Sequence, residues 1–229
     1  MRLLLFDVDG TLLSARGAGR MALRRALDEV YGTTGPIDDY DFRGRTDPRI
    51  VLDLLGAVGW EEDDVRARLE ACFAVYVREL DALIADGAQV RLMPGAAEVV
   101  RVLSAREDAL VGLLTGNIEP GARVKLRPTG LWPLFRVGAF GSDDLDRRRL
   151  PAVACARARA LLGCEIPFER VTIIGDTPLD VDCARACGAL AVAVATGQHA
   201  APELAACEPD LLFADFSDVH RVIDALCPR

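Results

Sequence analysis

The segment LLLFDVDGTLL, residues 3–13, sets two carboxylates, Asp7 and Asp9, directly behind an uninterrupted apolar run. A short apolar run of this kind is typical of a strand buried on both faces, as in a parallel sheet covered by helices. Buried acids raise the free energy of the folded state unless another group compensates them. We therefore expect the rest of the chain to supply the compensating groups.

Strand and helix patterns alternate along most of the chain. Further short apolar runs occur at residues 109–114, 137–140, 171–174, 190–195 and 211–213. Helical patterns lie between or after the later runs, at residues 120–129, 151–162, 179–187 and 202–207. This order predicts an α/β fold with a doubly wound parallel sheet.

One long segment interrupts the alternation. It shows helical patterns at residues 20–30, 48–58 and 63–86 and no buried strand. We therefore predict a helical insertion at residues 15–91, with residues 1–14 and 92–229 forming the α/β core. Pro94 and Gly95 are suited to turn the chain at the second boundary, before a new helix begins.

The composition argues against a nucleic-acid-binding protein and against a membrane protein. The chain has 229 residues, of which 51% are hydrophobic, and a net charge of −8. That charge argues against a general affinity for nucleic acid or an anionic membrane. No apolar stretch approaches the roughly 20 residues of a membrane span, and the seven scattered cysteines favour a reducing compartment, so we predict a cytoplasmic protein. The sequence carries no signal of oligomeric state.

Polar residues follow the predicted strands, at the sheet edge where ligands of doubly wound sheets bind. The first strand is followed by Asp7 and Asp9, the second by Thr115, Gly116 and Asn117, the third by Asp143 and Asp144, and the fourth by Asp176 and Asp180. Acids gathered at one edge repel one another. A hard divalent cation such as Mg²⁺, which prefers oxygen ligands, would resolve that conflict.

Four motifs in order carry a resemblance to a known family. They are DVDGTLL at residues 7–13, LLTGN at 113–117, a basic region at 147–149 and IIGDTPLD at 173–180. On these motifs the chain resembles the haloacid dehalogenase-like hydrolase superfamily, in its phosphoglycolate-phosphatase-like branch. The resemblance implies a Rossmann-like core with an α-helical cap, and a Mg²⁺-dependent phosphatase acting on a small phosphorylated metabolite.

The resemblance also implies roles for the acids. Asp7 would attack phosphorus and form an aspartyl phosphate, and Asp9 would act as general acid and then general base. Asp7, the main-chain oxygen of Asp9 and Asp176 would hold Mg²⁺. Asp180 would orient a metal-bound water.

Small residues complete the implied phosphate site. Gly10 permits the tight turn and the close approach of backbone to phosphoryl oxygens. The Thr115 hydroxyl and the Gly116 amide resemble the motif that hydrogen-bonds a phosphoryl oxygen. In the insertion, the loop DFRGRTDP makes Arg45 the candidate for substrate recognition.

The cation that faces the nucleophile departs from the family pattern. The family commonly has a lysine after the third strand, but this chain has arginines there, at residues 147–149, and Lys125 is its only lysine. A guanidinium is a planar fork and does not simply replace an ammonium. A helical Lys125 would lean back toward the strand ends, so Lys125 and Arg147 both stand as candidates.

Several alternative functions stay open at this point. A phosphomutase would use the same acids. A 2-haloacid dehalogenase has no leaving oxygen to protonate and does not call for Asp9, while phosphonate cleavage would need a lysine in the insertion, which has none. A non-catalytic binding protein would not need Asp7, Asp9 and Asp176 together.

Overall fold

The computed structural model describes residues 1–85, 87 and 89–228, and its centre is a parallel six-stranded sheet. The strands lie in the order β5-β4-β1-β6-β7-β8. Their bounds are β1 Arg2–Phe6, β4 Ala109–Thr115, β5 Val137–Phe140, β6 Val171–Gly175, β7 Leu190–Val194 and β8 Leu211–Phe213. Each lies within one residue of its predicted range. Because the order reverses at β1, the carboxyl ends of β4, β1 and β6 border a natural ligand crevice.

The strands form because their side chains are buried on both faces of the sheet. In β1, Leu4 and Phe6 pack into one apolar cluster, while Leu3 and Leu5 pack into another on the opposite face. This period of two is the strand geometry expected of a sheet covered on both sides. The continuous apolar runs of the sequence therefore predict the strands of this sheet correctly, including its edge strands β5 and β8.

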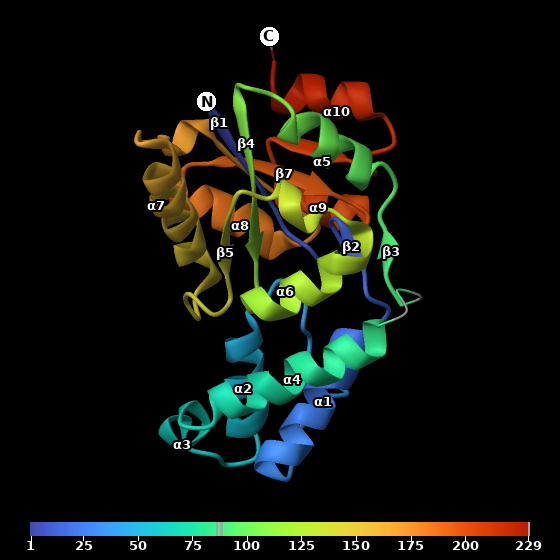
Figure 1. Cartoon of the computed structure of the whole chain (residues 1–229), viewed down its shortest axis with the longest axis vertical. Helices are drawn as coiled ribbons and strands as arrows, with labels where there is room; N and C mark the ends of the chain where they lie inside the picture. The colour runs from blue at the N-terminus through green and yellow to red at the C-terminus, as the bar shows by residue number, and fades with distance from the viewer. Residues whose placement is uncertain (86, 88, 229) are drawn as a thin grey trace.

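Helices cover both faces of the sheet (Figure 1). The helices α5 Ala96–Ser104, α6 Glu119–Leu126 and α10 Val219–Leu226 contribute to the cluster that contains Leu4. The helices α7 Leu150–Leu162, α8 Pro178–Cys187 and α9 Ala201–Ala206 contribute to the cluster that contains Leu3. Within the described residues, no helix is both long and apolar enough to cross a membrane.

The predicted insertion is helical and lies beyond the carboxyl ends of the strands (Figure 1). It consists of α1 Ala18–Tyr31, α2 Asp47–Gly56, α3 Glu62–Arg66 and α4 Leu69–Ile84. The prediction of one helix over residues 63–86 was wrong, because the chain breaks between α3 and α4. At the break the Tyr31 hydroxyl donates a hydrogen bond to the carbonyl of Val65 at 2.8 Å, a contact from outside the segment. Residue 86, the predicted end, lies outside the described residues.

Two short strands join the inserted helices α1–α4, called the helical layer below, to the sheet. The sequence did not predict these strands. β2 Leu13–Ser14 pairs antiparallel with β3 Arg91–Leu92. The amide of Met93 also donates to the carbonyl of Leu12 at 2.9 Å. The chain thus leaves and re-enters the part that contains the six-stranded sheet through one paired ribbon.

Candidate active site

The loop after β1 places both acids of the opening segment at the carboxyl edge of the sheet. Asp7 is buried, with 7% of its side chain exposed, whereas Asp9 is 41% exposed. The loop turns at Gly10, whose φ is +87°, and a Cβ there would lie 2.3 Å from Oδ2 of Asp176. Glycine is required at this position by the left-handed backbone and by the nearness of the carboxylate.

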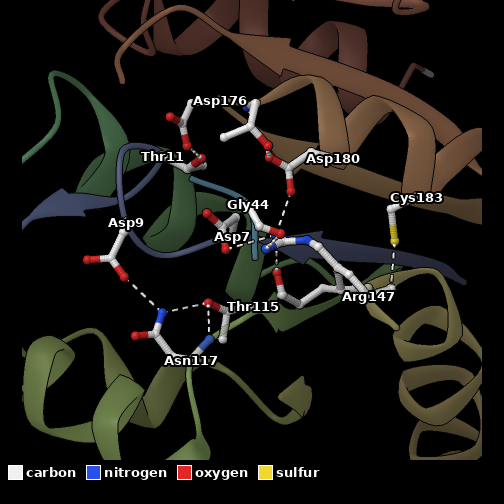
Figure 2. Close-up of polar contacts among 12 residues, drawn as sticks. Asp7, Asp9, Thr11, Gly44, Thr115, Asn117, Arg147, Asp176, Asp180 and Cys183 are labelled. Atoms are coloured by element: carbon white, nitrogen blue, oxygen red, sulfur yellow. Dashed lines mark hydrogen bonds and ion pairs between the residues drawn. The ribbon is translucent and has the colours of Figure 1, made fainter. Parts of the chain in front are cut away.

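Asp7, Asp176 and Asp180 form an acidic cluster, in which ligand oxygens lie within 4.8 Å of one another. The Thr11 hydroxyl donates to Oδ1 of Asp176 at 3.0 Å (Figure 2). Burial, followed by repulsion from Asp7 and Asp180, raises the pKa of Asp176 well above its ordinary value. A cation bound among these oxygens would offset both effects, so the donor set fits a hard divalent ion.

Asp7 belongs to this cluster and also contacts a cation. Burial raises the pKa of Asp7 to about 6, Arg147 opposes the rise, and Asp180 and Asp9 add to it. The carboxylate form, which a nucleophile needs, is therefore favoured by any further positive charge brought to the cluster.

Arg147 is the cation that contacts Asp7. Its Nη2 lies 3.0 Å from Oδ1 of Asp7 and 2.5 Å from Oδ1 of Asp180, and its Nη1 donates to the carbonyl of Gly44 at 3.2 Å (Figure 2). Burial lowers the pKa of Arg147, but Asp180 and Asp7 outweigh it and raise the pKa above its ordinary value. Arg148 and Arg149 are exposed and pair with Asp146 and Asp144 instead.

Lys125 reaches the strand ends as its helical position predicts, but it contacts the other acid. Its Nζ lies 2.6 Å from Oδ2 of Asp9 and donates to Oδ1 of Asn117 at 2.6 Å. Only 6% of the side chain is exposed. The sequence left open whether Lys125 or Arg147 faces Asp7. In the structure Arg147 contacts Asp7, and Lys125 contacts Asp9.

The segment after β4 brings Thr115, Gly116 and Asn117 to the site. The Thr115 hydroxyl accepts hydrogen bonds from the backbone amide of Asn117 at 3.3 Å and from its side-chain amide at 2.8 Å. Gly116 lies against the helical layer, because a Cβ there would be 2.0 Å from the carbonyl oxygen of Arg45.

Asp180 has both carboxylate oxygens engaged by protein groups. Oδ1 accepts a hydrogen bond from Arg147. Oδ2 accepts hydrogen bonds from the backbone amide of Thr177 at 3.0 Å and from its hydroxyl at 2.7 Å. The bond from the Thr177 amide is one half of the capping box at the start of α8. The predicted role in orienting a metal-bound water stays a prediction, while the observed contact is with Arg147, which also contacts Asp7.

A cavity of about 650 Å³ lies between the sheet edge and the helical layer and is lined by Asp7, Asp9, Thr115 and Arg45 among others. The Arg45 guanidinium lies 5.4 Å from the ring centroid of Tyr40 and 3.5 Å from Oδ2 of Asp53. The structure thus brings all the predicted site residues to the sheet edge or the cavity.

Three contacts at this site were not anticipated from the sequence. Thr11 positions Asp176, Asn117 joins Asp9 to Thr115, and Asp47 accepts the amide of Ile118 at 2.8 Å. Asn117 had a usable signal, since it follows a buried strand. The other two depend on pairings between distant segments.

Comparisons with known proteins agree with this geometry. The haloacid dehalogenase-like hydrolase family matches residues 4–185. A phosphoglycolate phosphatase of Synechococcus elongatus is 29% identical over 99% of both chains, and one of Rhodospirillum rubrum is 30% identical over 94% of this chain and 88% of its own. A crystal structure of a hydrolase from Pseudomonas syringae shares the fold with a TM-score of 0.73, at 20% identity over 98% of this chain and 99% of its own. The chain therefore belongs to the haloacid dehalogenase-like hydrolase family, in its phosphoglycolate-phosphatase-like branch, and is a phosphatase.

Proposed function

We propose that the protein is a Mg²⁺-dependent phosphatase that hydrolyses a small organic phosphate monoester through an aspartyl phosphate on Asp7. The observation that carries the proposal is the position of Asp7, whose buried carboxylate contacts the Arg147 guanidinium at 3.0 Å and has an oxygen within 4.8 Å of oxygens of Asp176 and Asp180. A carboxylate so placed is suited to attack a bound phosphoryl group and to remain ionised while it does so.

In the first step an oxygen of Asp7 forms a bond to phosphorus, and the bond from phosphorus to the leaving alcohol oxygen breaks. Protonated Asp9 gives its proton to that oxygen, so the alcohol leaves neutral. In the second step a water oxygen attacks phosphorus, its proton passes to Asp9, and the bond to Asp7 breaks. Inorganic phosphate leaves and Asp7 is restored as a carboxylate.

Mg²⁺ would be held by Asp7, Asp176 and the main-chain oxygen of Asp9. When bound, the ion would supply positive charge next to the phosphoryl oxygens and the nucleophile. Gly10 and Gly197 support this assignment, because a Cβ at either position would overlap the carboxylate of Asp176. The backbone at these two glycines thus packs directly against the Asp176 carboxylate.

The phosphoryl group would be bound by Thr115, the Gly116 amide, the backbone at Gly10 and Arg147. The Thr115 hydroxyl accepts two bonds from Asn117, which directs its single proton elsewhere. Arg147, which contacts Asp7, would supply positive charge beside the phosphoryl group bound there. A developing negative charge would therefore meet donors fixed before substrate arrives.

We also propose that residues 15–91 form a cap domain that closes the cavity and that Arg45 contacts the substrate there. The two phosphoglycolate phosphatases among the relatives support a small phosphorylated metabolite as substrate. A cap of this kind excludes water during the reaction and opens to release product. The free cysteines favour a reducing compartment, and the cytoplasm is the proposed location.

A panel of phosphate monoesters tests the proposal. The panel contains 2-phosphoglycolate, glycerol 3-phosphate, glucose 6-phosphate and p-nitrophenyl phosphate, each with Mg²⁺ or with EDTA, together with a glucose bisphosphate assay for mutase activity and a 2-haloacid. We expect phosphate release from at least one monoester in Mg²⁺ only. Release from none, or turnover of the haloacid instead, would reject the assignment.

The nucleophile has its own test. Asp7→Asn should abolish phosphate release, whereas Asp108→Asn, an exposed acid paired with Arg106 just before β4, should retain it. Mass spectrometry of acid-quenched wild type should find the phosphoryl group on the peptide that contains Asp7. Full activity in Asp7→Asn would contradict the aspartyl-phosphate route.

A further inference from the structure

The environment of Lys125 sets it apart from the phosphoryl-binding groups. Its ammonium is covered by the helical layer, since a Cβ at Gly19 of α1 would lie 3.4 Å from Nζ and 3.7 Å from the Tyr76 hydroxyl of α4. The position next to Asp7 is already taken by Arg147. The only lysine of the chain is thus buried beside Asp9.

Lys125, Asn117 and Asp9 form a closed ring of hydrogen bonds. Oδ2 of Asp9 accepts from Nζ of Lys125 at 2.6 Å and from Nδ2 of Asn117 at 2.8 Å. Oδ1 of Asn117 accepts from the same ammonium at 2.6 Å, so each donor also fixes the other. Figure 2 shows Asn117 reaching Asp9 and Thr115 with one amide group.

The ring distinguishes the two oxygens of Asp9. Oδ2 has two donors, whereas no described residue donates a hydrogen bond to Oδ1. The Asp9 side chain is 41% exposed and lines the cavity. One oxygen is therefore held and the other is free to meet a substrate.

We propose that Lys125, together with Asn117, is a positioning residue that holds Asp9 by Oδ2, so that Oδ1 is the oxygen that exchanges protons with the leaving alcohol and with water. The inference rests on the proposed function, because it assigns the reacting oxygen of the general acid. Two donors fix the carboxyl group about its side-chain torsions. A proton donor displaced by about 1 Å loses on the order of 100-fold in rate.

This role predicts a loss that depends on the leaving group. An alkoxide needs protonation as it departs, while p-nitrophenolate is stable without it, so a misplaced Asp9 should slow alkyl phosphates far more. The parameter to compare is kcat/KM, which covers the steps up to release of the alcohol. Loss of a phosphoryl-binding group such as Arg147 should instead slow both kinds of substrate alike.

The test compares Lys125→Met with Arg123→Met, which removes an exposed cation from the same helix. For the fastest alkyl phosphate of the panel, Lys125→Met should lower kcat/KM about 100-fold, and for p-nitrophenyl phosphate less than about 10-fold. Arg123→Met should leave both values unchanged. An equal loss on both substrates in Lys125→Met would overturn the inference while leaving the proposed phosphatase intact.

Asn117→Ala provides an independent arm if Lys125→Met does not fold, as judged by its melting curve. It removes one donor to Oδ2 and one acceptor of the ammonium, while the direct contact of Lys125 with Asp9 is kept. The same preference for the activated ester should therefore appear, with a smaller loss on the alkyl phosphate. Equal losses on both substrates in this variant would also overturn the inference. If wild type hydrolyses neither ester class, the proposed function itself fails.

Discussion

At the scale of single residues, the proposed nucleophile Asp7 is paired with an arginine, where the resemblance to the family implies a lysine. The guanidinium of Arg147 contacts Asp7, Asp180 and the carbonyl of Gly44 at once. A lysine has one nitrogen and no planar fork, so it cannot place donors at the positions of both Nη1 and Nη2. We expect Arg147→Lys to lower kcat/KM by about 100-fold or more, as removal of a fixed transition-state donor does. Steady-state kinetics on the best monoester measures this, and a loss below about 10-fold would contradict it.

Thr11 is a second residue with a testable role, because its substitution should change the Mg²⁺ requirement without changing the rate of the chemical steps. Its hydroxyl holds Asp176, so Thr11→Val leaves the carboxylate in place but frees its orientation. We expect the Mg²⁺ concentration for half-maximal activity to rise about 10-fold or more, with little change in rate at saturating Mg²⁺. Thr172→Val, the same change at a buried position of β6, is the matched control. Equal Mg²⁺ requirements in both variants would argue against a positioning role for Thr11.

At the scale of elements, Asp47 joins helix α2 to helix α6. Its carboxylate accepts the amide of Ile118, the residue that precedes α6, and its own amide donates to the carbonyl of Gly116 at 2.7 Å. An acid from the helical layer thus satisfies a free amide at the start of a core helix. The favourable dipole of that helix end is opposed by the partial removal of the Asp47 carboxylate from water, which has a measurable consequence for stability.

Burial raises the pKa of Asp47 to about 6, although Lys125 and the Ile118 amide oppose the rise. The folded state therefore binds a proton more tightly than the unfolded state, and stability is lost as pH rises from about 4 to about 6. Asp47→Asn keeps an acceptor for Ile118 and cannot titrate. Over this window its free energy of unfolding, measured by urea denaturation in EDTA, should gain about 2 kcal/mol relative to wild type.

Asp41→Asn serves as the control for that experiment. The hydrogen bond from Arg43 lowers the pKa of Asp41 to about 2, so its contribution changes below pH 4 rather than above it. The difference between Asp41→Asn and wild type should stay constant from pH 4 to pH 6. A constant difference for Asp47→Asn as well would show that Asp47 does not titrate in this range.

The elements also show what a sequence can and cannot reveal. The six core strands were predicted within one residue, because burial on both faces leaves an apolar run that is visible locally. The break between α3 and α4 was missed, since neither glycine nor proline marks it and a contact from Tyr31 accompanies it. The sequence also could not show which cation contacts which aspartate. Arg147 reaches Asp7, and Lys125 reaches Asp9, only because the fold brings distant segments together at the sheet edge.

At the scale of the whole molecule, one loop docks the helical layer on the core. In this docking loop, residues 44–47, Gly44 accepts from Arg147, the Thr46 hydroxyl donates to the carbonyl of Leu145 at 3.1 Å, and Asp47 bonds to the segment after β4. The same segment after β4 carries the proposed phosphoryl-binding groups. Docking of the helical layer and formation of the site are therefore geometrically linked.

Gly116→Ala tests that link, because the new methyl group would lie 2.0 Å from the carbonyl oxygen of Arg45 while the amide proposed to bind phosphate is retained. The contact is with backbone, so the docking loop must move away. We expect kcat/KM to fall by about 100-fold, as misplacement of a site by about 1 Å does, and proteolysis within the loop to become faster. Gly56→Ala, at the end of α2 with no atom within 4 Å of the added carbon, should change neither. A Gly116→Ala variant with wild-type activity and wild-type proteolysis would show that catalysis does not require the docked arrangement.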